Sequence, residues 1–379
     1  MEEFNIWDLE RVNIKLKIDF LKKINEKIDN NFKFKTAFLK KISQENKINL
    51  FFIKNIIKPS YKLFSPLDSW LLICKELDIT KEELQSNISS YKTSGGINFV
   101  ANPVLPIKIT PIFDMLLAHN IGDGTVINPG KGRLPYFGYR QFNKFYRVSY
   151  VRKIEEIFGK IKFKEDYFEK STRPYCPPVL SSLFFKYYHL DVKSFISDTA
   201  RIPSLIFDKG KESMLAVLIA LIIDEGNIDS TQITINLKNV ALIGDLRDIC
   251  ERLHYKSKIT QSLKEKETNY ARLHILREGM KKFYEDYAEL NSKYSIINLG
   301  WKGEKIKSSF KIYNRDVYKK QGNKELLLNL LKKEQLSVNQ LAEMINMTRQ
   351  GVRFHIHNLL KEGKIKIVNS NELNWIYGV

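Results

Sequence analysis

Two long stretches in the middle of the chain repeat one order of hydrophobic and polar positions. Each opens with an apolar segment at helical spacing that ends in an acid and a glycine, MLLAHNIGDGT in the first and LIALIIDEGNI in the second. A strand, an amphipathic helix, a strand-rich stretch and a closing helix are then predicted. The strand and the two helices fall at residues 136–142, 150–158 and 180–188, and again at 232–237, 242–253 and 279–287. The pattern predicts a duplicated unit, residues 107–195 and 200–297.

The first hundred residues carry short helical patterns instead. Helices are predicted at residues 34–42, 50–58 and 66–77, with Pro59 ending the second and Ser65 capping the third. We therefore expect a helical domain at 1–95. It resembles the helix-turn-helix of Cro-like DNA binders, with 50–58 as recognition helix, and a generic helical cap is an equal alternative. Residues 91–106 are rich in Gly, Asn and Pro and are predicted to be a linker.

The last 56 residues show the most sharply defined pattern. A leucine-rich helix at 324–333 precedes a capping box, Ser337 with Gln340, and a further helix is predicted at 348–361. Two strands, at 365–368 and 373–377, close the pattern. This order resembles that of winged helix-turn-helix regulators, so we expect such a domain at 324–379. Residues 301–323 are expected to be a basic tether.

The net charge of the chain indicates which class of partner it binds. Lys and Arg total 62 against 43 Asp and Glu, a formal net charge of +19, which favours a polyanion because each neutralised phosphate releases counterions. The alternative is the Lys, Ile and Asn bias of an AT-rich genome. Three dispersed cysteines form no CxxC pair, which excludes a cysteine zinc site of that spacing. No signal sequence or membrane-spanning run is found, so we expect an intracellular, cytoplasmic protein associated with the nucleoid.

The two acid-and-glycine motifs resemble those of the LAGLIDADG homing endonucleases. LIALIIDEG, residues 218–226, puts Glu225 where that family keeps its catalytic acid, and LLAHNIGDG, residues 116–124, places Asp123 there. The lead-in ARIPSLIFDKGKE, residues 200–212, resembles the family's as well. The resemblance covers about half of the chain. It implies an α+β core with saddle-shaped antiparallel sheets over double-stranded DNA, in a monomer with internal pseudo-two-fold symmetry.

The residues support a shared acid site independently. Small residues recur four apart on both apolar helices, at Ala118 and Gly122 and at Ala216 and Ala220. That spacing lets two helices pack closely, and parallel packing would bring Asp123 and Glu225 together. Two carboxylates at helix C-termini repel each other, whereas Mg²⁺ binds such oxygen ligands. The resemblance adds the backbone carbonyls of Gly122 and Asp224 as ligands. Ordinary polarity at a helix end, with glycine as C-cap, is the alternative.

Three residues depart from the family pattern. His119 and Asn120 stand at usually apolar positions, and Asp224 replaces a small residue. We expect His119 to be a hydrogen-bonded core or rim residue, and Asp224 either to tune a metal or to face solvent. Gln141 and Lys144 are candidates for supporting catalytic residues, and solvated strand residues are the alternative.

Three polar surfaces are candidates for contacting DNA. The first is an aromatic and basic strand in the first repeat. The second is the polar face of a strand in the second repeat, whose Ile233, Ile235 and Leu237 are expected to face the core. The third is the predicted recognition helix and wing at the end of the chain. The DNA-binding candidates are Tyr139, Arg140, Gln232, Thr234, Asn236, Lys238, Thr348, Arg349, Gln350, Arg353, Lys364 and Lys366. A winged helix that binds protein instead is the alternative for the last six.

The leading functional hypothesis is a site-specific, metal-dependent endonuclease that cuts both strands of DNA. A non-catalytic transcription regulator on the same scaffold is the runner-up, and an intron-RNA splicing cofactor is a third option. An intein is not expected, because the chain begins Met-Glu-Glu and ends Tyr-Gly-Val, without the splicing residues.

Overall fold

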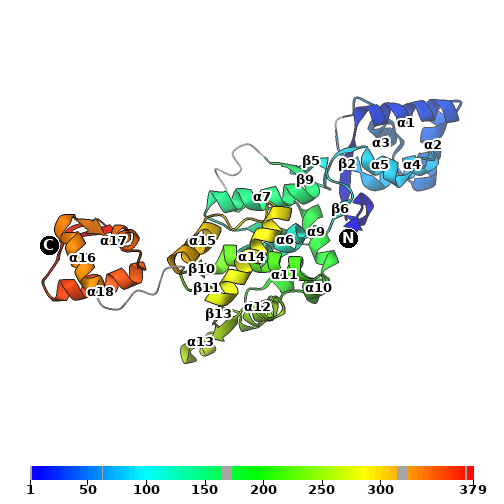
Figure 1. The fold of residues 1–379 in the computed structure, drawn as a ribbon. Coiled ribbons are helices and arrows are strands. Elements are labelled where there is room, and N and C mark those ends of the chain that lie inside the picture. Colours follow the sequence, from blue (N-terminus) through cyan, green and yellow to red (C-terminus); the bar gives the residue numbers. More distant parts are fainter. Residues whose placement is uncertain (1, 62, 131, 164–172, 314–321, 372–373) are drawn as a thin grey trace. The chain divides into compact units, whose positions relative to one another are not determined.

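The computed structural model describes residues 2–61, 63–130, 132–163, 173–313, 322–371 and 374–379, and combines helices with antiparallel sheets (Figure 1). Its backbone contacts separate two units. The large unit comprises Met1–Asn227 with Ile233–Leu299, and the small unit comprises Ile228–Gln232 with Gly300–Val379. Within the described residues, no helix is long and apolar enough to cross a membrane.

The N-terminal part of the large unit mixes helices with strands. Its elements are β1 (Glu3–Phe4), η1 (Ile6–Asp8), β2 (Val12–Leu16), α1 (Ile18–Asn31), α2 (Lys35–Asn46), α3 (Leu50–Ile56), β3 (Ser65–Pro66), α4 (Leu67–Glu76), α5 (Lys81–Ser86), β4 (Ile88–Thr93), β5 (Phe99–Pro103) and β6 (Ile107–Lys108). The five helices gather in one cluster (Figure 1). The three predicted helices are present as α2, α3 and α4. The connection from α2 to α3 is tight, since Lys47 adopts a left-handed conformation and Asn49 caps α3 through the Phe51 and Phe52 amides.

The linker expected at residues 91–106 is wrong. Residues 88–93 and 99–103 form β4 and β5, which pair antiparallel with Tyr91 opposite Val100. Both side chains are fully buried, and the two glycines that suggested a linker, Gly95 and Gly96, lie in the short connection between the strands. The pair belongs to a five-stranded sheet of order β3-β2-β4-β5-β9. The first 95 residues are therefore not purely helical.

The two halves of the core begin alike and then differ in strand pairing. The first half contains α6 (Pro111–Ile121), β7 (Gly124–Ile127), β8 (Tyr136–Tyr139), α7 (Lys144–Phe158), β9 (Gly159–Lys162), α9 (Pro178–Tyr187) and η2 (Val192–Phe195). There β7 and β8 form a two-stranded sheet, whereas β9 pairs with β5. The strand predicted at 136–142 ends at Tyr139.

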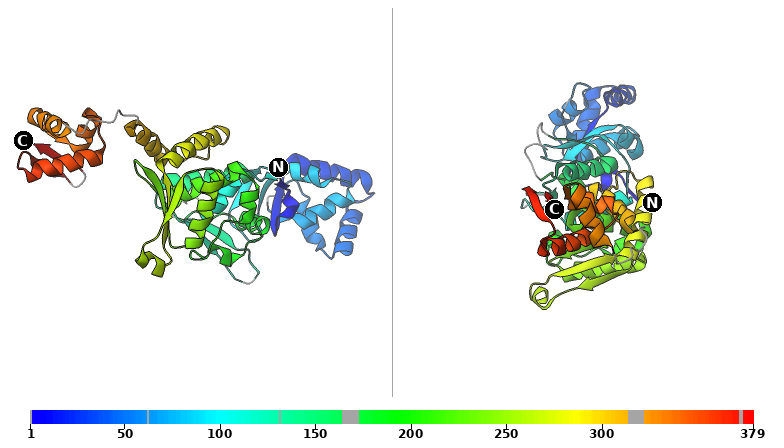
Figure 2. Two further views of the ribbon diagram at one scale, coloured as in Figure 1. Left: turned by 60° about the horizontal axis from the view of Figure 1, so that its bottom comes forward. Right: turned by 60° about the vertical axis from the view of Figure 1, so that its left-hand side comes forward.

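The second half follows the predicted order more closely. It contains α10 (Ser204–Asp208), α11 (Lys211–Glu225), β10 (Gly226–Ile228), β11 (Gln232–Leu237), α12 (Val240–Arg252), β12 (Ser257–Thr260), α13 (Leu263–Glu267), β13 (Ala271–Leu276) and α14 (Arg277–Lys293). Its strands form one sheet of order β10-β11-β13-β12 (Figure 2). The strand expected at 232–237 is confirmed as β11. Because strand pairing differs between the halves, duplication and a saddle shape stay predictions.

The small unit ends in three helices and a three-stranded sheet. Its elements are α15 (Trp301–Tyr313), α16 (Asn323–Lys333), β14 (Leu336–Ser337), α17 (Val338–Met344), α18 (Arg349–Lys361), β15 (Lys366–Asn371) and β16 (Asn374–Gly378). The predicted capping box is confirmed, with the Ser337 hydroxyl accepting from the Gln340 amide and the Gln340 side chain accepting from the Ser337 amide. Helices α16 to α18 share a buried core with Ile365 and Tyr377. The tether expected at 301–323 is wrong for its first part, because α15 occupies residues 301–313; residues 314–321 lie outside the described residues.

Candidate functional site

The apolar helices of the two motifs, α6 and α11, pack against each other within the large unit. Every residue of α6 is buried, and in α11 the run from Ser213 to Ile223 is buried too. The helices approach each other closely near their C-terminal ends, where a Cβ added to Gly122 would lie 2.9 Å from Oδ2 of Asp224. The next residues, Asp123 and Glu225, are each partly exposed. The structure thus brings the two motif ends together.

Both motifs need glycine after the acid because the chain turns back closely over the last helical turn. A Cβ at Gly124 would lie 2.2 Å from the carbonyl oxygen of Asn120, and one at Gly226 would lie 2.5 Å from that of Ile222. Both oxygens belong to the backbone of the preceding helix, so neither can move away as the end of a flexible side chain could. The acid-then-glycine signature therefore has a steric reason, which is the same at both ends.

Gln141, one of the two candidate supporting residues, contacts the first acid. Its Nε2 donates to Oδ2 of Asp123 over 2.9 Å, while its Oε1 accepts from the Asn143 amide at 3.3 Å. The loop is held in turn by Arg147, whose guanidinium donates to the carbonyls of Gln141 and Phe142. The other candidate, Lys144, begins α7 and is exposed. Gln141 was expected at the end of the strand predicted at residues 136–142. It lies instead in the loop that follows β8.

The Asp224 side chain does not face solvent, which excludes one of the two roles expected for it; the other, tuning of a metal, stays a prediction. Its side chain has no exposed area, and its carboxylate accepts from His119 Nδ1 at 2.9 Å and from the Tyr139 hydroxyl at 2.6 Å. Gly122 and Asp224 occupy equivalent positions, each directly before its acid, so the missing side chain on α6 makes room for the carboxylate on α11.

His119 is a buried, hydrogen-bonded histidine, as expected. Burial lowers the pKa of His119, although the nearby Asp224 carboxylate acts in the opposite direction. A neutral ring with its proton on Nδ1 suits donation to Asp224. The sequence contained a partial signal for this contact, because His119 and Asp224 are polar residues in two largely apolar helices; Asn120 beside His119 is polar as well.

Tyr139 lies in the core, so its expected role as a reader of DNA is wrong for the protein in this conformation. It is fully buried, donates to Asp224 and stacks on Tyr150 with ring centroids 4.4 Å apart. Burial, reinforced by Asp224, raises the pKa of Tyr139 far above its ordinary value. Of the aromatic residues in this strand, Tyr139 thus packs against α7, whereas Phe137 packs against Phe184 of α9. The neighbour of Tyr139, Arg140, is exposed, with its backbone amide bonded to the Asp123 carbonyl at 2.9 Å.

A buried lysine near these groups was missed. Lys153 of α7 is 1% exposed, and its Nζ donates to the Ser149 hydroxyl over 2.8 Å. Burial lowers the pKa of Lys153 to about 8, an effect that the charge of Asp224 partly offsets. Within the amphipathic pattern of α7 this lysine looked like any other polar position, and only the packed helix shows that it faces inward.

The polar face of the second half's sheet is partly enclosed. Thr234 of β11 is 9% exposed and its hydroxyl contacts His274 Nδ1 at 3.1 Å, while Nε2 of the same ring contacts the Thr260 hydroxyl at 2.8 Å. The result is a polar row across β11, β13 and β12. Gln232 and Asn236 are partly exposed and Lys238 is exposed. Ile233 and Ile235 are buried as expected, whereas Leu237 is partly exposed.

The predicted recognition helix of the small unit presents its basic residues to solvent. Arg349, Gln350 and Arg353 of α18 are exposed, as are Lys364 and Lys366 near the start of β15. Thr348 has a different role, because its hydroxyl accepts from the Gly351 amide at 3.0 Å and so caps α18. Lys364 pairs with Glu362 at 3.1 Å.

Comparison with known proteins identifies one part of the chain. A family model described as winged helix-turn-helix DNA-binding matches residues 323–366. The C-terminal domain is therefore a winged helix-turn-helix, as its sequence pattern indicated. No curated protein matches the chain.

Several solved structures are distantly similar. A mesophilic variant of the homing endonuclease I-DmoI has 15% identity over 46% of this chain and 87% of its own, with a TM-score of 0.32. I-DmoI in complex with DNA and Mn gives 18% identity, coverages of 45% and 93%, and a TM-score of 0.32. Full-length DUF199/WhiA from Thermatoga maritima gives 13%, coverages of 67% and 91%, and a TM-score of 0.30. Such low TM-scores establish no common fold.

Proposed function

We propose that the chain is a site-specific double-strand DNA endonuclease of LAGLIDADG type, with Asp123 and Glu225 as its metal-binding acids. The observation that carries the proposal is the close approach of α6 and α11 at their C-terminal ends, where Gly122 lies against Asp224. Each acid directly follows this contact and is partly exposed. The net charge of +19 and the C-terminal winged helix-turn-helix support DNA as the partner.

Folding alone gives no reason to place acids there. The C-terminal end of a helix carries a partial negative charge, so a carboxylate there is unfavourable, and two adjacent carboxylates repel each other. Gln141, held by Arg147, donates to one oxygen of Asp123 and fixes the orientation of that carboxylate. A positioned acid with such a support is what a reaction site requires.

The donor set fits a divalent cation that also binds DNA. Mg²⁺ is commonly held by one or two carboxylates together with substrate phosphates and water. Among the described residues no group of three or more His, Cys, Asp or Glu could hold a metal, so phosphate and water would complete a set begun by Asp123 and Glu225. The cation would activate water and stabilise the leaving oxygen. Backbone carbonyls of Gly122 and Asp224 remain the proposed additional ligands.

The test is a selection of bound duplexes from a random pool in calcium, followed by transfer to magnesium. Wild type is expected to bind in both and to cleave both strands only in magnesium, and Glu225→Gln is expected to bind but not to cleave. Glu267→Gln, which neutralises an exposed acid of α13, is the matched control and should cleave like wild type. Selective binding without any cleavage by wild type would contradict the endonuclease proposal.

That outcome would favour the second candidate, a non-catalytic transcription regulator. The observation behind it is the winged helix, whose recognition helix exposes Arg349 and Arg353, since a nuclease core needs no additional reader. In either function the linked domain would raise the effective concentration of the core near its DNA. We propose a monomer in both cases.

The winged helix is expected to read bases through Arg353. Replacing it with alanine should weaken binding to the selected duplex by about 1–3 kcal/mol, because a bidentate arginine contact to a base is lost. Fluorescence anisotropy with selected and scrambled duplexes measures both affinity and selectivity. Lys332→Ala, which removes an exposed charge from α16, is the control. Equal effects of the two substitutions, or no effect of Arg353→Ala on selectivity, would assign the helix to something other than base recognition.

A further inference from the structure

A pocket of about 520 Å³ lies between two glycine-containing connections of the large unit. One is the turn between β4 and β5, residues 94–98, and the other is the connection between β7 and β8, where Gly132 and Arg133 line the wall. Its volume is in the range of small-ligand sites. Nothing in the proposed acid site uses this pocket, which lies at the opposite end of the β7–β8 hairpin.

Two arginines line the pocket, and none of its described lining residues is acidic. Arg133 is exposed, and Arg11 is exposed as well. Arg11 has a φ of 54°, a left-handed conformation that is unfavourable for a residue with a side chain. Its carbonyl accepts from the Ser94 amide at 2.8 Å, and its guanidinium donates to the Gly132 carbonyl. The arginine is thus tied to both connections.

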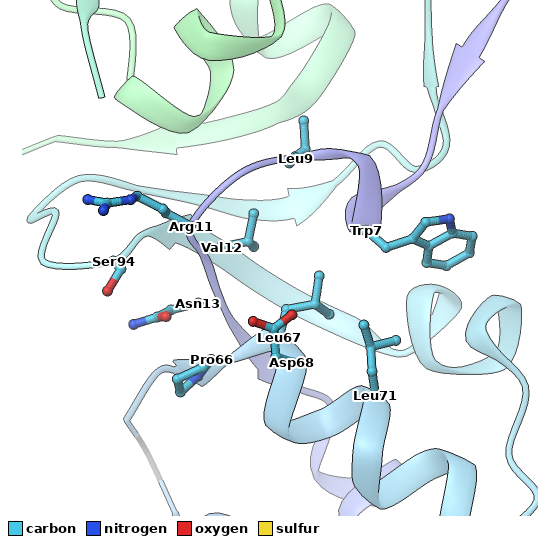
Figure 3. A pocket seen from close by; sticks show the side chains of 10 residues that line it. All are labelled: Trp7, Leu9, Arg11, Val12, Asn13, Pro66, Leu67, Asp68, Leu71 and Ser94. Atoms are coloured by element: carbon cyan, nitrogen blue, oxygen red, sulfur yellow. The ribbon is translucent and has the colours of Figure 1, made fainter. Parts of the chain in front are cut away.

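Figure 3 shows the same arginine from an adjoining cavity of about 400 Å³, where Arg11 lies on the side of Ser94 and away from Trp7. Arg11 and Ser94 line both cavities. The adjoining cavity also contains an acid, Asp68, and so has no single sign of charge. Of these two cavities, the one with Arg133 has arginines and no acidic side chain among its described lining residues.

The glycines leave the backbone accessible. Gly95 and Gly132 have φ values of 77° and 76°, and a Cβ built on either would meet nothing within 4 Å. Their conformation explains why glycine stands there, and the open space lets a ligand approach the main chain. Turns of this kind can direct amides at an anion.

Two tyrosines form an aromatic wall. Tyr136 of β8 and Tyr175 lie edge to face with ring centroids 5.7 Å apart, and both are partly exposed. Tyr175 is held by an isolated bridge to Gly138. Partly exposed rings beside arginines suit a nucleotide, since bases stack on aromatic side chains and arginine binds phosphate.

We propose that this pocket, the Arg11–Arg133 pocket, binds one nucleotide, with the arginines at its phosphate and the tyrosines against its base, which leaves the duplex stack to reach them. The inference rests on the proposed DNA-binding function and adds to it a contact outside the acid site. Along the hairpin, Ile127 pairs with Tyr136 at the pocket end and Gly124 with Tyr139 at the acid end. Three strand residues span about 10 Å, or roughly three nucleotide steps of a DNA strand, so one duplex can reach both.

The experiment compares Arg133→Gln and Ser94→Asp with wild type in the full chain. Ser94 is exposed, so an added carboxylate would repel phosphate without burying a charge. Binding of a fluorescent 30-base-pair duplex is measured in calcium over a range of salt concentrations. Arg133→Gln should weaken binding several-fold. It should also make the negative slope of log affinity against log salt less steep by about one, as expected for one lost phosphate contact. Arg152→Gln, an exposed arginine of α7, is the matched control.

A second arm separates the two sources of a nucleotide. Thermal shift of the same proteins is followed with millimolar deoxynucleoside monophosphate. If the nucleotide raises the melting temperature of wild type but not of either variant, and duplex binding is unchanged in both variants, the pocket binds a free nucleotide. If wild type binds the duplex, neither variant alters that binding and the nucleotide gives no thermal shift, the pocket proposal is overturned while the proposed function stands. If wild type binds no duplex, the proposed function fails, and the nucleotide arm still decides the pocket.

Discussion

Asp224→Ala is expected to lower the free energy of unfolding of the large unit by about 3–5 kcal/mol. The side chain has no exposed area and accepts from His119 and Tyr139, both buried. Alanine would leave two buried donors without their acceptor, at about 1–3 kcal/mol each, and would open a cavity between α6 and α11. Hydrogen exchange of the amides of these two helices in sub-denaturing urea measures the effect in this unit alone.

Two further variants distinguish lost hydrogen bonds from a general effect of removing an acid. Asp224→Asn keeps the size of the side chain and a carbonyl oxygen for the Tyr139 hydroxyl, so a smaller loss is expected. Asp208→Ala removes an exposed acid at the end of α10 and should change stability little. A loss below about 1 kcal/mol for Asp224→Ala would show that the carboxylate does not hold the two helices together.

Lys153→Met is expected to have the opposite sign and to stabilise the large unit at neutral pH by about 2–3 kcal/mol. Burial lowers the pKa of Lys153 from 10.5 to about 8, so at pH 7 the folded protein holds a charged lysine that the unfolded chain would hold more easily in water. Methionine has a similar length and no charge. The gain is measured as above, with Lys160→Met, an exposed lysine of β9, as control.

The pH dependence of this gain tests its cause. Between about pH 8 and 10.5 the unfolded chain keeps the lysine proton that the folded protein has released, so the stability contribution of Lys153 rises with pH. The difference between Lys153→Met and wild type should therefore shrink over that window, and it should be constant below pH 7. A destabilised variant at pH 7 would mean that the ammonium group is fully compensated by Ser149 and Asp224.

Local sequence patterns predicted the structure correctly where the stabilising contacts lie within one short segment. The capping box of Ser337 and Gln340 and the apolar spacing of α18 involve residues a few positions apart, and the winged helix-turn-helix was predicted from them. The Thr348 cap is equally local but was not predicted, because Thr348 was expected to contact DNA. β11 alternates apolar and polar residues and was predicted with its observed bounds. The error at β4 and β5 arose because Gly95 and Gly96 mark a hairpin turn as readily as a linker, and only the pairing of Tyr91 with Val100 decides between them.

The candidate site divides in the same way. The sequence by itself determined which acids end the two apolar helices, and it determined the glycines that follow them, because a Cβ at Gly124 or Gly226 would collide with the helix's own last turn. Only the tertiary structure decided that Asp224 is buried against His119 and Tyr139, and that Lys153 faces inward. These contacts join helices and strands far apart in the chain. A polar residue's partner across such an interface depends on packing, which no local spacing encodes.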